Sequence, residues 1–138
     1  MAQTIRDVMT PDPVVLSASS SLEDAARAMK QSDIGDVLVS DDDGKLCGIV
    51  TDRDIVVRGL AEGRASASLG EICSTEPVAV APNDSLTDAV RLMGEHAIRR
   101  LPVTDHGRPV GMVSLGDLAL ERDRESVLAE ISAAPANQ

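Results

Sequence analysis

The sequence predicts an α+β protein composed of two similar units, each with the order strand, helix, strand, strand, helix. Three observations lead to this prediction. Ile5–Leu16 aligns with Leu69–Val80 without a gap. A helical apolar pattern follows each of these segments, and two short apolar runs separated by a turn follow each helical pattern. A unit of this size buries little apolar surface alone, so we expect the two units to pack together around a pseudo-two-fold axis.

The repeat extends over most of the chain. Partner residues lie 64 positions apart up to Asp41 and Asp105, and 63 positions apart after the turn at Asp41–Gly44, which has one extra acidic residue. The identical pairs include Pro13/Pro77, Val14/Val78, Ser21/Ser85, Leu22/Leu86, Asp24/Asp88, Ala25/Ala89, Met29/Met93, Ile34/Ile98, Val39/Val103, Gly48/Gly111 and Asp54/Asp117. Glycines, a proline and an apolar period that stay aligned with a single gap indicate a duplicated structure.

The elements of each half follow from local patterns. In the first half we expect a strand at Val14–Leu16, a helix with the apolar face Leu22, Ala25, Ala26 and Met29, strands at Val37–Ser40 and Leu46–Val50, and a helix from Thr51. In the second half we expect a strand at Val78–Val80, a helix with the apolar face Leu86, Ala89, Val90 and Met93, strands at Leu101–Thr104 and Val110–Val113, and a helix from Ser114. Ser21 with Asp24, and Ser85 with Asp88, are typical of N-terminal capping pairs.

These patterns divide the chain into three parts. Residues 1–66 hold the first repeat with its N-terminal segment, and residues 67–122 hold the second repeat, with residues 61–68 as the connection. Residues 123–138 are expected to hold a helical stretch at Ser126–Ile131 and a frayed tail.

Composition limits what the core and any ligand site can contain. The chain has 138 residues, about one domain, and no Phe, Tyr or Trp. Its core must therefore consist of aliphatic side chains, and a flat ring bound here must lie against aliphatic groups or peptide planes. Cys47 and Cys73 lack metal-ligand spacing and are interpreted as small buried apolar residues.

Charge and hydropathy exclude several partners. With 13 basic and 23 acidic residues the formal net charge is −10, which disfavours nucleic acid and anionic membranes. No apolar run approaches the roughly 20 residues that span a bilayer, and the N-terminus lacks the layout of a secretion signal. We therefore expect a cytoplasmic protein.

A motif occurs once in each half: GIVTDRD at Gly48–Asp54 and GMVSLGD at Gly111–Asp117. Thr or Ser followed three residues later by Asp is the capping-box pattern, which stabilises a helix start. A hydroxyl and free N–H groups at a helix N-terminus also suit a phosphate, and the Asp could accept hydrogen bonds from a ribose. Both interpretations remain open. Nearby cations for a phosphate could come from Arg53, Arg58, Arg99 and Arg100.

The two halves resemble a tandem pair of cystathionine beta-synthase (CBS) domains. The resemblance rests on DVMTPDPVVL, SLEDAARAM and DIGDVLVSDDDGKLCGIVTDRDI in the first half, and on EICSTEPVAVAPNDSLTDAVRLMGEHAIRRLPVTDHGRPVGMVSLGDL in the second. It covers about residues 4 to 121. It implies two units packed through their sheets with two clefts between them, assembly into a homodimer, and an adenine nucleotide or S-adenosylmethionine as a regulatory ligand rather than a required cofactor.

The resemblance also assigns residues to the two clefts. The ligand-binding residues implied for one cleft are Thr51, Asp54, Thr75, Pro77, Val78, Ile98, Arg99, Arg100 and Leu101. Those implied for the second cleft are Ser114, Asp117, Thr10, Pro13, Val14, Ile34, Gly35, Asp36 and Val37. Arg99 and Arg100 correspond to Gly35 and Asp36, so the second cleft has less positive charge and the first is favoured for ligand.

Catalysis and metal binding find little support in the sequence. There is no nucleophile with an adjacent base and no Walker-type phosphate loop, so we expect no enzyme and no catalytic residues. The Asp41–Gly44 run lacks the ligand pattern of a calcium loop and is interpreted as a hairpin turn. His96 and His106 have no companions at zinc-ligand spacing, so no metal site is expected.

Two functions remain. The first is a stand-alone sensor that binds an adenosyl ligand in a cleft and signals to an unidentified effector protein by a conformational shift. The second is a ligand-free dimeric interaction module whose repeated motifs only cap helices.

Overall fold

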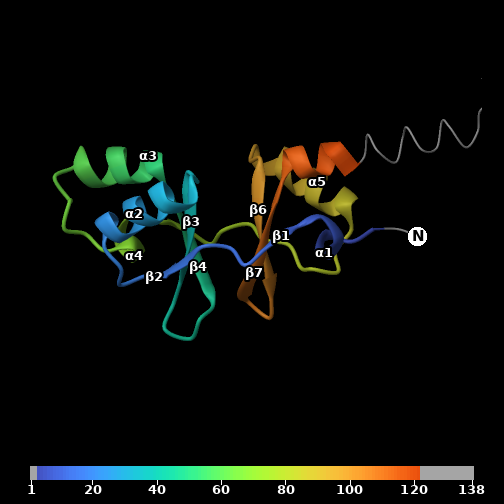
Figure 1. Ribbon diagram of the computed structural model, residues 1–138, viewed down its shortest axis with the longest axis horizontal. Coiled ribbons are helices and arrows are strands. Elements are labelled where there is room, and N and C mark those ends of the chain that lie inside the picture. The colour runs from blue at the N-terminus through green and yellow to red at the C-terminus, as the bar shows by residue number, and fades with distance from the viewer. Residues whose placement is uncertain (1–2, 122–138) are drawn as a thin grey trace, which may run out of the picture.

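The structure is a computed structural model, and it describes residues 3–121. Two sheets face each other across the centre of the molecule, with helices on their outer sides (Figure 1). One sheet has the strand order β2-β3-β4-β5 and the other the order β1-β7-β6. This α+β arrangement of two similar units confirms the predicted fold class. The expected helix at Ser126–Ile131 lies outside the described residues.

The elements of the first half are α1 (Ile5–Val8), β1 (Thr10–Pro11), β2 (Val15–Ser17), α2 (Leu22–Ser32), β3 (Asp36–Ser40), β4 (Leu46–Thr51), α3 (Asp52–Asp54) and the π-helix η1 (Ile55–Leu60). Those of the second half are α4 (Leu69–Ile72), β5 (Ser74–Thr75), α5 (Leu86–His96), β6 (Arg100–Asp105) and β7 (Arg108–Ser114), followed by a helix over residues 115–121. Both amphipathic helices and all four strands of the two hairpins occur where the sequence predicts them.

The first segment of each half packs against the other half. Strand β1 pairs antiparallel with β7, and strand β5 pairs antiparallel with β4. Accordingly Ile5 is buried in the core that α5, β6 and β7 form, whereas Leu69 and Ile72 are buried in the core of α2, β3 and β4. The two halves are therefore interlocked by an exchange of segments.

Glycine makes this exchange possible at Gly48 and Gly111. A Cβ on Gly48 would lie 2.6 Å from the carbonyl oxygen of Ser74, and a Cβ on Gly111 would lie 2.6 Å from the Met9 sulfur. Gly48 and Gly111 have no side chain, which permits the close approach of another segment. The structure shows that the exchanged segment of the other repeat makes the approach.

The strand expected at Val78–Val80 is not formed, and only Val80 makes an isolated bridge, to Val103. In the first half the N–H of Leu38 donates to the carbonyl of Val14 and begins the pairing of β2 with β3. The equivalent residue of the second half is Pro102, which has no N–H to donate. The second sheet therefore lacks the strand that would match β2.

Candidate functional site

A cavity of about 500 Å³, named here the larger cleft, opens between the two sheets. Its lining residues are Asp36, Ile49, Thr51, Ser74, Thr75, Glu76, Pro77, Val78, His96, Ile98, Arg99, Arg100 and Met112. They come from both halves, mainly from β4, from the segment after β5 and from the start of β6. The cavity therefore exists only because the two halves pack together.

Most residues that the resemblance assigns to this cleft do line it: Thr51, Thr75, Pro77, Val78, Ile98, Arg99 and Arg100. Asp54 and Leu101 do not. Leu101 is fully buried in the second core, because alternate residues of a strand point to opposite faces and Arg100 takes the cleft side. Asp54 lies one helical turn beyond Thr51 and is occupied by the cap. Arg53 and Arg58 also line neither cleft.

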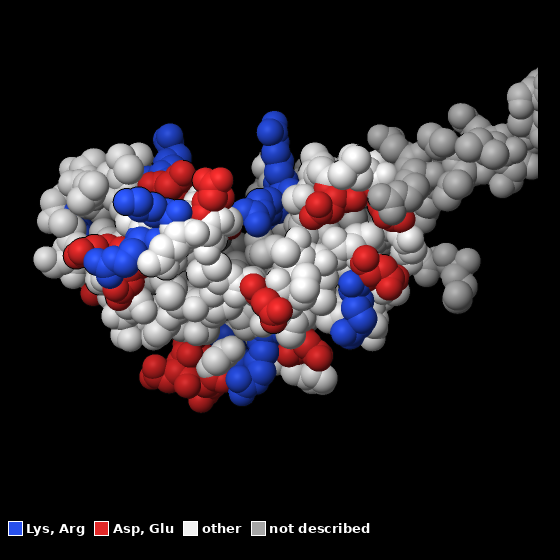
Figure 2. Space-filling model, viewed as in Figure 1, with Lys and Arg blue, Asp and Glu red and all other residues white. Residues whose placement is uncertain are grey.

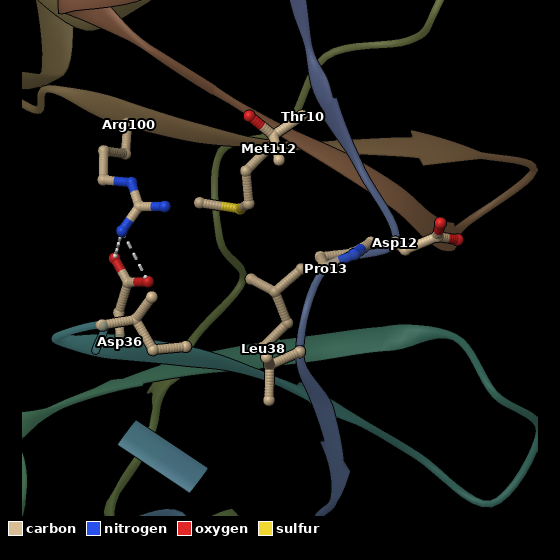
Figure 3. A pocket seen from close by; sticks show the side chains of 9 residues that line it. Thr10, Asp12, Pro13, Asp36, Leu38, Arg100 and Met112 are labelled. Atoms are coloured by element: carbon tan, nitrogen blue, oxygen red, sulfur yellow. Dashed lines mark hydrogen bonds and ion pairs between the residues drawn. The ribbon is translucent and has the colours of Figure 1, made fainter. Parts of the chain in front are cut away.

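The second cleft is much smaller, with a volume of about 160 Å³. It is lined by Thr10, Asp12, Pro13, Val14, Ile34, Asp36, Leu38, Arg100 and Met112. Among the residues assigned to it, Thr10, Pro13, Val14, Ile34 and Asp36 are lining residues, whereas Ser114, Asp117, Gly35 and Val37 are not. Leu38 and Met112 project into the space from opposite sheets (Figure 3).

An ion pair between Arg100 and Asp36 lines both clefts. Nη1 of Arg100 lies 2.8 Å from each carboxylate oxygen of Asp36, and both residues line both cavities (Figure 3). Their side chains are 41% and 19% exposed, respectively. Asp36 thus offsets part of the Arg100 charge at the clefts. Arg99 lines only the larger cleft and makes no ion pair within residues 3–121.

The charges of the larger cleft are mixed. Arg99, Arg100, Asp36, Glu76 and His96 all line it, and Figure 2 shows basic and acidic side chains side by side at the hollow between the two lobes. The remainder of the lining is mostly aliphatic. Such a site can hold a flat ring between apolar side chains while one anionic group meets the cationic side of the cleft.

Both repeated motifs form complete capping boxes. Oγ1 of Thr51 accepts from the N–H of Asp54 at 3.0 Å, and a carboxylate oxygen of Asp54 accepts from the N–H of Thr51 at 3.0 Å. Ser114 and Asp117 make the same two bonds, at 3.0 and 3.2 Å. The capping interpretation of the motif is confirmed, and Thr51 additionally faces the larger cleft.

Acidic residues in the left-handed backbone region stand at the edge of each cleft. Asp12 has φ +54° and Glu76 has φ +51°, and each precedes a proline that lines the same cavity. The two residues are 64 positions apart, so the strain is a feature of the repeat. Sequence patterns alone do not reveal a left-handed residue other than glycine.

Sequence reasoning missed several lining residues. Ile49, His96 and Met112 line the larger cleft, and Asp36, assigned to the second cleft alone, lines both. Ile49 and Met112 are equivalent apolar positions, one residue after Gly48 and Gly111, so strand alternation next to the motif was an available signal. The contact of Asp36 with the larger cleft depends on how the sheets face each other and has no local signal.

Both cysteines are free, with Cys73 buried and Cys47 half-buried. Burial raises the pKa of each thiol above the ordinary value of 9.0, and for Cys47 the nearby Cys73 and Asp41 raise it further. The thiols therefore stay protonated and weakly nucleophilic near neutral pH. Within residues 3–121, no three His, Cys, Asp or Glu side chains gather as metal ligands, and no helix is suited to cross a bilayer.

The duplicated fold, with clefts at its pseudo-two-fold axis, defines a tandem domain pair. The family model of the CBS domain matches residues 5–60 and 69–123, one copy in each half. The chain therefore belongs to the CBS domain family.

Known proteins resemble the chain over nearly its whole length. The CBS domain-containing protein YhcV of Bacillus subtilis is 42% identical over 120 residues, which cover 86% of this chain and 85% of YhcV. The crystal structure of hypoxic response protein I with two coordinated zinc ions is 37% identical, covers 86% of this chain and 98% of its own, and superposes with a TM-score of 0.78. The crystal structure of CBSX2 in complex with AMP is 27% identical, covers 90% and 98%, and has a TM-score of 0.77.

Proposed function

We propose that the chain is a regulatory module that binds an adenosyl ligand in the larger cleft and thereby changes its interaction with an effector protein. The observation that carries this proposal is the combination of a largely apolar slot of about 500 Å³ with Arg99 at its side, a cation that makes no ion pair within residues 3–121. The AMP complex of CBSX2 supports the ligand class. Two free thiols suit a reducing cytoplasm as the place of action.

The larger cleft is the proposed ligand site because of its volume. Small-molecule pockets commonly have volumes of about 300–1,000 Å³, and the larger cleft falls in this range whereas the second cleft, at about 160 Å³, does not. Leu38 and Met112 occupy part of the second cleft. We therefore propose one ligand per chain.

Charge favours a single phosphate. Arg100 is shared with Asp36, which leaves Arg99 as the cation of the cleft without a carboxylate partner in the described chain. One such cation matches one phosphate group better than a polyphosphate chain. We propose AMP as the first ligand to test, before ADP, ATP and S-adenosylmethionine.

The second candidate function is a ligand-free dimeric interaction module. It is favoured by the complete capping boxes at Thr51 and Ser114, which account for the repeated motif without any ligand.

A dye-monitored thermal shift of dialysed protein tests the proposal, since the chain lacks Trp and Tyr. AMP at 100 times its dissociation constant should stabilise the native state by about 2.7 kcal/mol, which raises Tm by several degrees. Arg99→Gln should lose most of this rise and keep the Tm of the free protein. Arg53→Gln makes the same charge change outside both clefts and should respond to AMP as the wild type does.

The two candidates predict different outcomes. A rise with AMP that Arg99→Gln abolishes supports the sensor. If none of the four adenosyl compounds changes the Tm, the sensor is excluded and the interaction module remains.

A further inference from the structure

The Asp36–Arg100 ion pair joins equivalent positions of the two repeats. The residues lie 64 positions apart, at the starts of β3 and β6. Residues related by a two-fold axis meet each other when they lie close to that axis. Identical charges there would repel, so a pair of opposite charges explains why this position differs between the repeats.

Asp36 also places a carboxylate inside the larger cleft. It is only 19% exposed, and its contact with Arg100 at 2.8 Å occupies the cation that faces the cavity. An anionic ligand group that reaches Arg100 must share it with this carboxylate and lies near a like charge. The ion pair uses only Nη1 of Arg100, so an anion that binds the other donors of the guanidinium shares its charge with Asp36.

We propose that Asp36 determines the charge specificity of the larger cleft: its carboxylate competes with the ligand's phosphate for Arg100 and thereby selects against polyphosphates. This inference rests on the proposed ligand-binding function of that cleft. Each additional negative charge on the ligand increases the repulsion by Asp36, whereas a neutral ligand is unaffected. The cleft should accordingly prefer AMP to ADP and ADP to ATP.

The expected size follows from Coulomb's law. Removing one unit charge at a separation of about 6 Å changes the affinity by about threefold to tenfold for each unit of negative charge on the ligand, when the effective dielectric constant is roughly 40 to 80. The phosphate of AMP carries between one and two such charges, so Asp36→Asn should tighten AMP by at least that factor and ATP by more, and leave adenosine unchanged. Asn is isosteric with Asp, and circular dichroism checks that the variant is folded.

Isothermal titration of wild type and Asp36→Asn with adenosine, AMP, ADP, ATP and inorganic pyrophosphate, without magnesium, tests the proposal. Asp42→Asn is the matched control, because Asp42 is exposed in the β3–β4 turn and lines neither cleft. Asp36→Asn combined with Arg100→Gln should lose most of the gain, since the competition requires Arg100. Asp36→Ala serves as a second removal of the carboxylate.

The outcomes separate this proposal from the proposed function. If the Asp36 variants, but not Asp42→Asn, bind nucleotides more tightly than the wild type, and the gain in affinity increases with the charge of the ligand, both proposals are supported. If no adenosyl compound binds the wild type but Asp36→Asn gains pyrophosphate binding, the proposed function fails and the competition stands. Equal affinities in wild type and variants, or no binding of any anion to either, overturn the competition.

Discussion

The hydroxyl of Thr51 has two neighbours at once, the backbone of its own helix and the larger cleft. Its bond to the Asp54 N–H matches the bond of Ser114 to Asp117, although Ser114 lines no cleft. Both caps form, but only the one at Thr51 lies at the larger cleft. The capping role of the motif therefore does not depend on contact with the cleft. The cap exists with or without a ligand.

Removing the Thr51 cap should destabilise the protein. We expect Thr51→Ala and Ser114→Ala each to lower the free energy of unfolding by about 1 kcal/mol, since each leaves a helix N–H without its acceptor. Urea denaturation measures this loss. Thr51→Ser keeps the hydroxyl and should retain most of the stability, and an alanine variant as stable as the wild type would contradict the capping role.

The exchange of β1 and β5 depends on close contact between strands and neighbouring segments. At Gly48 the carbonyl of Ser74 and the Cys73 side chain occupy the space of a Cβ, so β5 can approach β4 only beside a glycine. Pro102 has a comparable effect in the second half. It lacks the N–H that Leu38 donates in the first half, and the strand equivalent to β2 does not form. Single residues thus decide which strands form in each sheet.

Two glycine substitutions should have opposite effects. Gly48→Ala forces β5 away from β4 and should cost roughly 1–3 kcal/mol of stability. Gly94→Ala is the matched control, because nothing lies within 4 Å of its Cβ position in α5, and it should stabilise the protein by about 0.5–1 kcal/mol. Chemical denaturation of both variants measures the difference. Equal stabilities would show that the β4–β5 contact relaxes freely.

Two helices lie along one edge of the molecule (Figure 1). Both carry exposed apolar side chains. Val56, Val57 and Leu60 of η1, and Leu115 and Leu120 of the helix over residues 115–121, are all exposed, up to 67% at Leu120. Exposed apolar side chains that gather in one patch mark association surfaces. We propose that this edge forms the homodimer interface.

Light scattering coupled to size exclusion tests the interface. The wild type should elute as a dimer, and Leu60→Glu should shift it toward monomer, because burying one Leu contributes about 1.5–3 kcal/mol and a buried unpaired Glu opposes association. Gln31→Glu, on the exposed side of α2, adds the same charge and should remain dimeric. A monomeric wild type, or a dimeric Leu60→Glu, would place the interface elsewhere or exclude it.

Much of the fold was readable from local patterns. The apolar periods of α2 and α5, the turns of both hairpins and the caps at Ser21 and Thr51 each involve residues within a few positions of one another. The strand expected at Val78–Val80 failed because its partner position is Pro102, which becomes a neighbour only after folding. The predictions of the caps, the amphipathic helices and the hairpins succeeded because the interacting groups are close in sequence.

Local patterns in the sequence specify the duplication, the helix starts, the two hairpins and the capping motif of each half. The exchange of β1 and β5, the unequal volumes of the two clefts and the contact of Asp36 with Arg100 depend on the tertiary structure instead. The difference lies in the sequence separation of the groups that interact. Capping and amphipathic burial act within a few residues, whereas the meeting of side chains 64 positions apart depends on how two whole units pack across their axis.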